Sequence, residues 1–128
     1  MSYSILIVDD SSITRAVLKK TIGMSNVSIN EIFEAGNGRE ALDILAKENV
    51  DLILADLNMP VMSGQEMVAK ILDNEETCHI PILVISTEAS TTRIDDLIDH
   101  GVKGYIHKPF TPEQVRDELM RVLATCSA

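Results

Sequence analysis

The sequence predicts an α/β domain in which one parallel β-sheet is covered by helices on both faces. Two observations predict this fold. Short apolar runs alternate with longer segments in which apolar residues recur every three or four positions, and the alternation occurs five times. Runs that are short and apolar throughout are typical of strands buried on both faces, as in parallel sheets. The predicted strands are residues 4–8, 31–35, 52–55, 82–85 and 104–107.

The third run, residues 52–55, is expected to be the central strand. It is bounded by polar residues, it ends in Asp56, and Pro60 follows a few residues later. Ligands of open parallel sheets bind beyond the carboxyl ends of the strands, so Asp56 lies where chemistry is expected. An aspartate after a strand can also simply cap the next segment, and Asp56 alone does not decide between the two interpretations.

The segments between the strands carry helix signals. One helix is expected to begin at Ser11 or Ser12, either of which can cap it, and to end at Gly23. Thr111 and Pro112 can open the last helix, because threonine caps helices and proline fits the first helical turn. The other helices are expected at residues 39–48, 67–72 and 91–100.

Each predicted helix has an apolar stripe that is expected to face the sheet. Residues three or four positions apart lie on the same face of a helix, which assigns the inward positions. They are Ile13, Ala16, Val17 and Leu18; Ala41, Leu42 and Leu45; Met67, Val68, Ile71 and Leu72; Ile94, Leu97 and Ile98; and Val115, Leu119, Val122 and Leu123.

The composition is that of one ordinary globular domain. With 128 residues, the chain is expected to form a single domain over residues 1–128, without a linker or a second domain. A net charge of −9 argues against a protein that binds nucleic acid or an anionic membrane surface. No segment has the pattern of a membrane span or a signal peptide, which favours a cytoplasmic location. Cys78 and Cys126 are expected to be reduced thiols.

Polar residues stand at the ends of four of the five strands. Asp9 and Asp10 follow the first strand and Asp56 follows the third, while Ser86 and Lys108 stand at the ends of the fourth and fifth. In a doubly wound sheet of order 2-1-3-4-5, the flavodoxin-like arrangement, the first and third strands are neighbours. Three carboxylates are therefore expected to converge in one crevice.

Such a cluster needs a compensating charge. Two like charges about 4 Å apart repel by roughly 4 kcal/mol near a protein surface. A carboxyl group must then take up a proton, or a cation must neutralise the cluster. Oxygen ligands suit a hard divalent ion, and Mg²⁺ is the ion expected here. Lys108 adds one fixed positive charge.

These residue types suit phosphoryl transfer. A metal ion and Lys108 can stabilise charge on the transferred group, and the Ser86 hydroxyl can donate a hydrogen bond to a phosphoryl oxygen. Asp56 can act as the nucleophile and form an acyl phosphate. The alternative is that all five residues only cap helices and turns, but five suitable residues at four strand ends make coincidence a poor explanation.

From residue 5 to about residue 123, the chain resembles a receiver domain of two-component response regulators, of the single-domain chemotaxis (CheY-like) type. The match includes the motif Gly104-Tyr105-Ile106-His107-Lys108-Pro109-Phe110 and the segment Asn58-Met59-Pro60. The other matching motifs are Val8-Asp9-Asp10-Ser11, Asp56-Leu57 with Gly64, and Ser86-Thr87-Glu88-Ala89.

The resemblance implies a role for each matching residue. Asp56 is the implied phosphoacceptor, Lys108 pairs with the phosphoryl group, and Ser86 is the switch hydroxyl. Tyr105 is the implied aromatic switch, although a tyrosine on an edge strand can also be only a packing residue. Mg²⁺ or Mn²⁺ would be held by Asp9, Asp10, Asp56 and the backbone carbonyl of Asn58, and access to the phosphoryl group would be modulated by Asn58, Thr87 and Glu88.

The resemblance also implies how the signal passes. The donor is a phosphohistidine on a sensor histidine kinase. The phosphorylated receiver, expected to be a monomer with no output domain, would bind a downstream protein through its fourth helix, fifth strand and fifth helix. It would catalyse only its own phosphorylation and dephosphorylation. Acidic residues of the fourth helix argue against a partner surface identical to that of motor-switch binders; they are Asp95, Asp96 and Asp99.

Three alternatives stay open. The protein could be a stand-alone phosphorelay intermediate that passes its phosphoryl group to a histidine phosphotransferase. It could be an autonomous Mg²⁺-dependent phosphatase, but such enzymes usually carry a second acid two residues after the nucleophile, where this chain has Asn58. It could also be a degenerate receiver that acts only as a protein-interaction module, but degenerate receivers usually lose one of the acids or the lysine.

Overall fold

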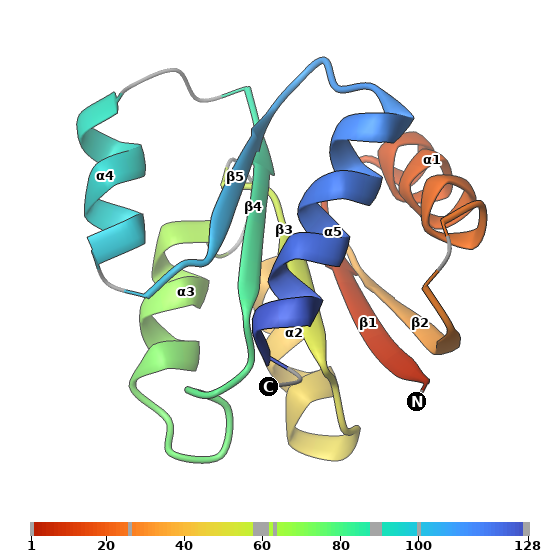
Figure 1. The fold of residues 1–128 in the computed structure, drawn as a ribbon. Helices are drawn as coiled ribbons and strands as arrows, with labels where there is room; N and C mark the ends of the chain where they lie inside the picture. The colour runs from red at the N-terminus through yellow and green to blue at the C-terminus, as the bar shows by residue number, and fades with distance from the viewer. Residues whose placement is uncertain are drawn as a thin grey trace.

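Five parallel strands form one sheet through the middle of the molecule, in the order β2-β1-β3-β4-β5 (Figure 1). The computed structural model describes residues 2–25, 27–57, 62, 64–87, 91–99 and 101–126, with the backbone alone for 91–94, 125 and 126. The strand order and the parallel pairing confirm the predicted doubly wound, flavodoxin-like fold. The strands are Tyr3–Val8 (β1), Ile29–Ala35 (β2), Leu52–Ala55 (β3), Ile82–Ser86 (β4) and Gly104–His107 (β5).

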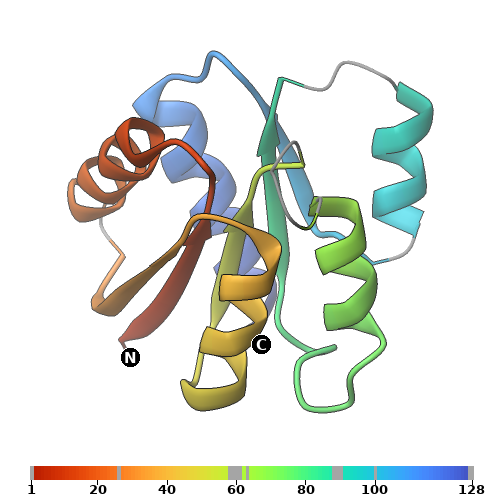
Figure 2. The same ribbon diagram turned by 180° about the vertical axis from the view of Figure 1, so that it is seen from behind.

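Helices cover both faces of the sheet, as Figures 1 and 2 show from opposite sides. Leu18 and Leu119, from the first and last helices, pack in one apolar cluster on one face. Ala41, Met67 and Leu97, from the three middle helices, pack in a second cluster on the other face. The helices are Ser12–Gly23 (α1), Gly38–Lys47 (α2), Gly64–Leu72 (α3), Thr91–Asp99 (α4) and Pro112–Cys126 (α5).

Burial on both faces of the sheet explains why the sequences of the central strands are apolar throughout. Every residue of β3 and β4 is buried. Side chains alternate along β1, so that Ile5 and Ile7 enter the cluster under α1 and α5, while Leu6 and Val8 enter the other cluster. The edge strand β2 is only partly buried and begins at Ile29, two residues before the predicted start.

Of the inward residues predicted for α1, Leu18 is buried as expected, but the prediction is wrong for Ile13, Ala16 and Val17. Ile13 and Val17 are 77% and 47% exposed, and the buried residues are Leu18, Thr21 and Ile22. At about 100° of rotation per residue, Val17 points well away from Leu18, and Ile13 points further still. Two overlapping sets of residues have helical spacing in this segment, and the set that packs on the sheet includes a threonine. Ala16, also expected to face inward, is exposed as well.

The other helices follow their predicted stripes with one further correction. Ile98 in α4 is 47% exposed, whereas its neighbour Leu97 is buried. The side chain of Ile94 lies outside the described residues. Every predicted inward residue of α5 is buried, and α5 begins with Thr111 and Gln114 each accepting a hydrogen bond from the backbone amide of the other.

Two further expectations can be compared with the described residues. Within that part of the chain, no helix is both long enough and apolar enough to cross a bilayer. Cys78 is an exposed free thiol, as expected. The side chain of Cys126 lies outside the described residues.

Candidate functional site

The pairing of β1 with β3 brings two of the predicted acids together. Val8 pairs with Ala55 in the sheet, and these are the last residues of the two strands. The backbone amide of Asp56 donates a 2.9 Å hydrogen bond to the carbonyl oxygen of Val8, which continues the pairing by one step. Asp9 and Asp56, the next residue on each chain, therefore emerge side by side at the carboxyl edge of the sheet.

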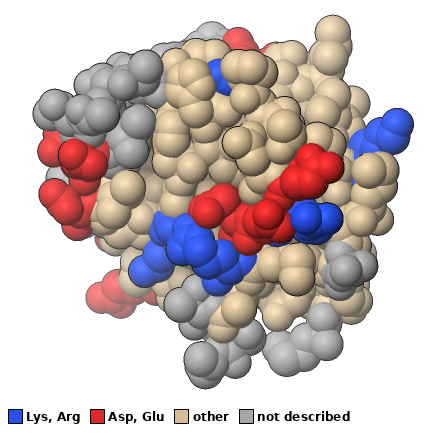
Figure 3. Space-filling view, turned by 45° about the horizontal axis from the view of Figure 1, so that its top comes forward, with Lys and Arg blue, Asp and Glu red and all other residues tan. Residues whose placement is uncertain are grey.

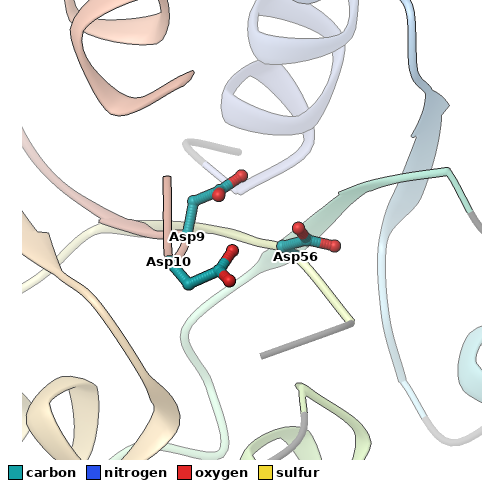
Figure 4. A group of neighbouring side chains, drawn as sticks. All are labelled: Asp9, Asp10 and Asp56. Atoms are coloured by element: carbon teal, nitrogen blue, oxygen red, sulfur yellow. The ribbon is translucent and has the colours of Figure 1, made fainter. Parts of the chain in front are cut away.

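Three carboxylates converge at this edge. One oxygen from each of Asp9, Asp10 and Asp56 lies within 4.8 Å of the others, and Figure 4 shows the three side chains in one region of space. Asp9 and Asp56 are 2% and 7% exposed, whereas Asp10 is open to solvent. A cluster of hard oxygen ligands with one open side could hold a divalent metal ion, as the sequence predicts.

Lys108 lies against the same cluster. Its ammonium nitrogen is 2.8 Å from Oδ2 of Asp9 and 3.1 Å from Oδ2 of Asp56. Partial burial alone would lower the pKa of Lys108, but its hydrogen bonds and charge interactions with Asp9 and Asp56 outweigh that effect and raise the pKa above its ordinary value. Lys108 is therefore a cation that bridges the two buried carboxylates.

Asp9 is held in place through both carboxylate oxygens. Oδ1 accepts a 2.9 Å hydrogen bond from the backbone amide of Ser11, and Oδ2 accepts the bond from Lys108. Ser11 in turn caps α1, because its hydroxyl accepts a 3.2 Å hydrogen bond from the amide of Thr14. The start of α1 therefore orients the first acid of the cluster.

Arg15 is a supporting residue that the sequence analysis missed. Its guanidinium group donates to the backbone carbonyl of Asp9 and, over 3.2 Å, to Glu34 on β2. Burial would raise the pKa of Glu34, but Lys19 and Arg15 together hold it below its usual value. The inward face predicted for α1 places Arg15 on the opposite, solvent-facing side of the helix. The apolar pattern therefore offered no reason to expect this contact. The residue is largely covered instead.

Ser86 and Tyr105 meet through the backbone. Ser86 is fully buried at the end of β4, and its carbonyl oxygen accepts a 2.8 Å hydrogen bond from the amide of Lys108. The same oxygen accepts a 3.1 Å hydrogen bond from the Tyr105 hydroxyl. Tyr105 is half-buried and packs against the apolar cluster under α2, α3 and α4. One carbonyl thus links the predicted switch hydroxyl, the predicted aromatic switch and the predicted site lysine.

Gly64 lets the first residue of α3 lie very close to the backbone at the end of β3. Its amide donates a 2.9 Å hydrogen bond to the carbonyl oxygen of Leu57. A β-carbon at this position would lie 2.2 Å from the carbonyl oxygen of Asp56 and 2.6 Å from the α-carbon of Leu57. Any side chain here would displace the backbone that carries Asp56. The only signal for Gly64 in the sequence was its place in the family motif.

Three predicted modulators remain untested by this geometry. Asn58, with its backbone carbonyl, and Glu88 lie outside the described residues. Thr87 is exposed just beyond β4. Their roles stay predictions from the resemblance.

Comparison with known proteins identifies the family. The model of the response regulator receiver domain matches residues 5–120. The chain belongs to this family. A chemotaxis protein CheY homolog of Campylobacter jejuni is 37% identical to this receiver over 124 residues, which are 96% of this chain and 94% of the relative.

Solved structures agree with this assignment. The chemotaxis response regulator CheY4 of Vibrio cholerae superposes on this receiver with a TM-score of 0.85 at 34% identity, covering 95% of this chain and 99% of CheY4. The phosphorylated cyanobacterial phytochrome response regulator RcpA superposes with a TM-score of 0.84 at 28% identity, covering 98% and 96% of the two chains. The predicted resemblance to CheY-type receivers of two-component signal transduction in chemotaxis is confirmed.

Proposed function

We propose that this receiver accepts a phosphoryl group on Asp56 from a phosphohistidine of a sensor histidine kinase, and that it signals in chemotaxis by binding a partner when phosphorylated. The observation that carries the proposal is the bridge that Lys108 makes between Asp56 and Asp9, at 3.1 and 2.8 Å, beside the carboxylate of Asp10. Phosphoryl-transfer sites typically combine a positive side chain, a carboxylate and a group of acidic residues that can hold a metal ion.

The site residues fit Mg²⁺, or Mn²⁺ in its place. Three carboxyl groups lie around one lysine, and all the candidate ligand atoms are oxygens. We propose Asp9, Asp10 and Asp56 as ligands, joined by the backbone carbonyl of Asn58 as the family resemblance implies. When bound, the ion would supply positive charge next to the transferred group.

The chemistry at Asp56 is nucleophilic displacement at phosphorus. A carboxylate oxygen of Asp56 forms the new phosphorus–oxygen bond as the phosphorus–nitrogen bond to the donor imidazole breaks. The imidazole nitrogen keeps the electron pair of that bond and takes up a proton from solvent. Lys108 and the Ser86 hydroxyl would then donate hydrogen bonds to the phosphoryl oxygens, since both belong to strand ends beside Asp56.

The switch would run from Ser86 to Tyr105. A phosphoryl group adds nearly two negative charges and strong acceptor oxygens beside Ser86. Movement of Ser86 toward them displaces the carbonyl that binds the Tyr105 hydroxyl, which releases that ring to change position. This change would alter the α4–β5–α5 surface that we propose for the partner. Acidic and basic side chains lie next to one another on the face of the molecule that Figure 3 shows. On α5, Arg121 and Glu118 form an ion pair of 2.7 Å.

The other functions receive less support. A degenerate interaction module would not need the assembled set of Asp9, Asp56 and Lys108. A phosphatase would need a second acid where the chain has Asn58. A phosphorelay intermediate would use the same site and differs only in its partner. Single-domain organisation stays a prediction, in keeping with the 94% of the Campylobacter relative that the chain covers.

Intact mass spectrometry after incubation with acetyl phosphate tests the proposal. A phosphoryl adduct should form only with Mg²⁺ present and should be absent in Asp56→Asn. Asp43→Asn is the matched control, because Asp43 is exposed on α2 and the variant makes the same change of charge. An adduct that persists in Asp56→Asn, or no adduct in the unmodified protein, would contradict the proposal.

A further inference from the structure

A groove lies between α3 and α4, away from the carboxylate cluster. The two helices stand side by side on the same face of the sheet in Figures 1 and 2. The groove has a volume of about 610 Å³. Within the described part of the chain, the residues that line it belong neither to the acidic cluster nor to β5 or α5. It is therefore a different surface from the one proposed for phosphorylation-dependent binding, although α4 contributes to both.

The floor of the groove is apolar. Ala69 and Leu72 of α3 and Leu97 of α4 contribute to its lining. Ala69 is exposed and Leu72 is only partly buried, so solvent reaches this apolar surface in the isolated chain. An apolar surface open to water gains free energy when a partner covers it.

The rim of the groove is mainly acidic. Asp73, at the end of α3, and Asp96, on α4, line it from opposite sides. Asp99 lies one helical turn beyond Asp96 and is also exposed, which extends the acidic side of α4. Lys70 is also in the lining, so acidic residues outnumber basic ones among the described residues that line the groove.

We propose that the α3–α4 groove binds an amphipathic helix of a partner protein, with apolar residues on one face and lysine or arginine on both flanks. A helix laid in a groove presents residues at three- and four-residue spacing to the floor, which suits the channel between two helices. α3 and α4 have nine residues each, a length of about 13 Å, enough for two to three turns of a partner helix.

Charge complementarity selects this occupant. Basic flanks would meet Asp73 on one side and Asp96 and Asp99 on the other, while an acidic helix would be repelled. The proposal does not rest on phosphorylation of Asp56, because no part of the groove involves that residue. Binding can therefore be measured on the unphosphorylated protein, and its failure would leave the proposed function standing.

The test is an amide NMR titration with a synthetic peptide of about 14 residues, with leucine on one helical face and lysine on both flanks. Shift changes should be confined to α3, α4 and their ends. A peptide of the same composition in scrambled order, with its leucines spread around the helix, should bind at least about tenfold more weakly. Ala69→Arg, which adds bulk and positive charge to the exposed floor, should abolish the shifts while circular dichroism shows a folded protein.

A pair of matched variants separates the groove from the overall negative charge of the protein. Asp73→Asn with Asp96→Asn should weaken binding about threefold to tenfold. Asp43→Asn with Asp117→Asn changes the net charge by the same amount at exposed positions on α2 and α5, and should leave binding unchanged. Equal weakening in both pairs, shifts spread over the whole acidic surface, or shifts in α3 and α4 that appear on concentrating the protein alone would overturn the proposal. The last result would assign the groove to a second copy of the chain.

Discussion

Lys108 donates a 2.8 Å hydrogen bond to Asp9, a residue 99 positions earlier in the chain. The two residues meet because β1 and β5 end at the same edge of the sheet, with β3 and β4 between them. The ammonium group also contacts Asp56, which lies between the two in sequence and in space. The stability of this edge therefore depends on one positive charge among three negative ones.

Replacing Lys108 with methionine should destabilise the protein. Lys108→Met keeps the length of the side chain but leaves Asp9 and Asp56 without their shared cation, and we expect the free energy of unfolding to fall by about 1–3 kcal/mol at neutral pH. Urea denaturation measures the loss. Lys47→Met, at an exposed position near the end of α2, is the control and should change stability by less than about 0.5 kcal/mol. Equal losses in the two variants would show that the bridge contributes nothing.

The contribution of Lys108 should disappear at high pH. Its pKa is raised in the folded protein, so the stabilising ammonium form is fully present below the ordinary lysine value of about 10.4 and is lost as the pH rises through the folded value. The stability difference between the unmodified protein and Lys108→Met should therefore be constant from neutral pH to about pH 10 and shrink above it. A difference that already shrinks between neutral pH and about pH 9 would mean that another group carries the effect.

Mg²⁺ should stabilise the folded protein through Asp10. A ligand that binds only the folded state at a hundred times its dissociation constant adds about 2.7 kcal/mol. Asp10→Asn should remove most of this gain. Without metal the variant should be slightly more stable than the unmodified protein, by up to about 1 kcal/mol, because it relieves repulsion at an exposed position.

Thermal unfolding with and without Mg²⁺ measures both effects of Asp10→Asn. Asp43→Asn should keep the full response to the metal, since Asp43 is exposed on α2 and is not one of the three clustered acids. A full Mg²⁺ response in Asp10→Asn would place the ion elsewhere.

The strand ends were predictable because sheet topology alone brings them together. Short apolar runs identify β3 and β4, whose residues are all buried, and the strand order then places Asp9 next to Asp56. Only the identity of the neighbouring strands matters for this inference. Side-chain conformations, which sequence patterns do not specify, were not needed.

The inward face of α1 was not predictable in the same way. Ile13 and Val17 satisfy helical spacing as well as Leu18 and Ile22 do, so the apolar pattern cannot choose between them. The face that packs inward includes Thr21, whose hydroxyl donates a 2.9 Å hydrogen bond to the carbonyl of Val17. A threonine satisfied by its own helix can be buried at little cost, and a count of apolar residues misses it.

The hydrogen bond from Tyr105 to Ser86 also could not be predicted from the sequence. Tyr105 was placed on β5 and expected either to switch or only to pack, but neither interpretation named a hydrogen-bond partner. The partner is a backbone carbonyl on the neighbouring strand, and every residue has such a group. Only the three-dimensional register of β4 and β5 reveals which carbonyl the hydroxyl reaches.

Gly64→Ala should be strongly destabilising. Its β-carbon would lie 2.2 Å from the carbonyl oxygen of Asp56, a backbone atom that cannot move without shifting the site. We expect a loss of about 3 kcal/mol or more in urea denaturation, together with weaker Mg²⁺ binding. Gly23→Ala is the control, because nothing lies within 4 Å of its β-carbon and the change should stabilise the protein by about 0.4–1 kcal/mol. Equal effects at the two glycines would show that position 64 tolerates a side chain.

Fluorotyrosine NMR can follow the proposed switch directly. The protein contains two tyrosines, and Tyr3 stands at the first residue of β1, at the opposite end of that strand from Asp9. Beryllium fluoride, which mimics a phosphoryl group on a carboxylate, should shift the Tyr105 signal and leave Tyr3 unchanged when Mg²⁺ is present.

Ser86→Ala identifies the route of the change. The variant keeps the carbonyl that accepts the Tyr105 hydrogen bond but lacks the hydroxyl that would reach the phosphoryl group. If Ser86 couples the two sites, Tyr105 should respond much less to beryllium fluoride in the variant, while Asp56→Asn should give no response. An unchanged Tyr105 response in Ser86→Ala would mean that the signal reaches β5 by another path, with the backbone bond from Lys108 to Ser86 as the next contact to test.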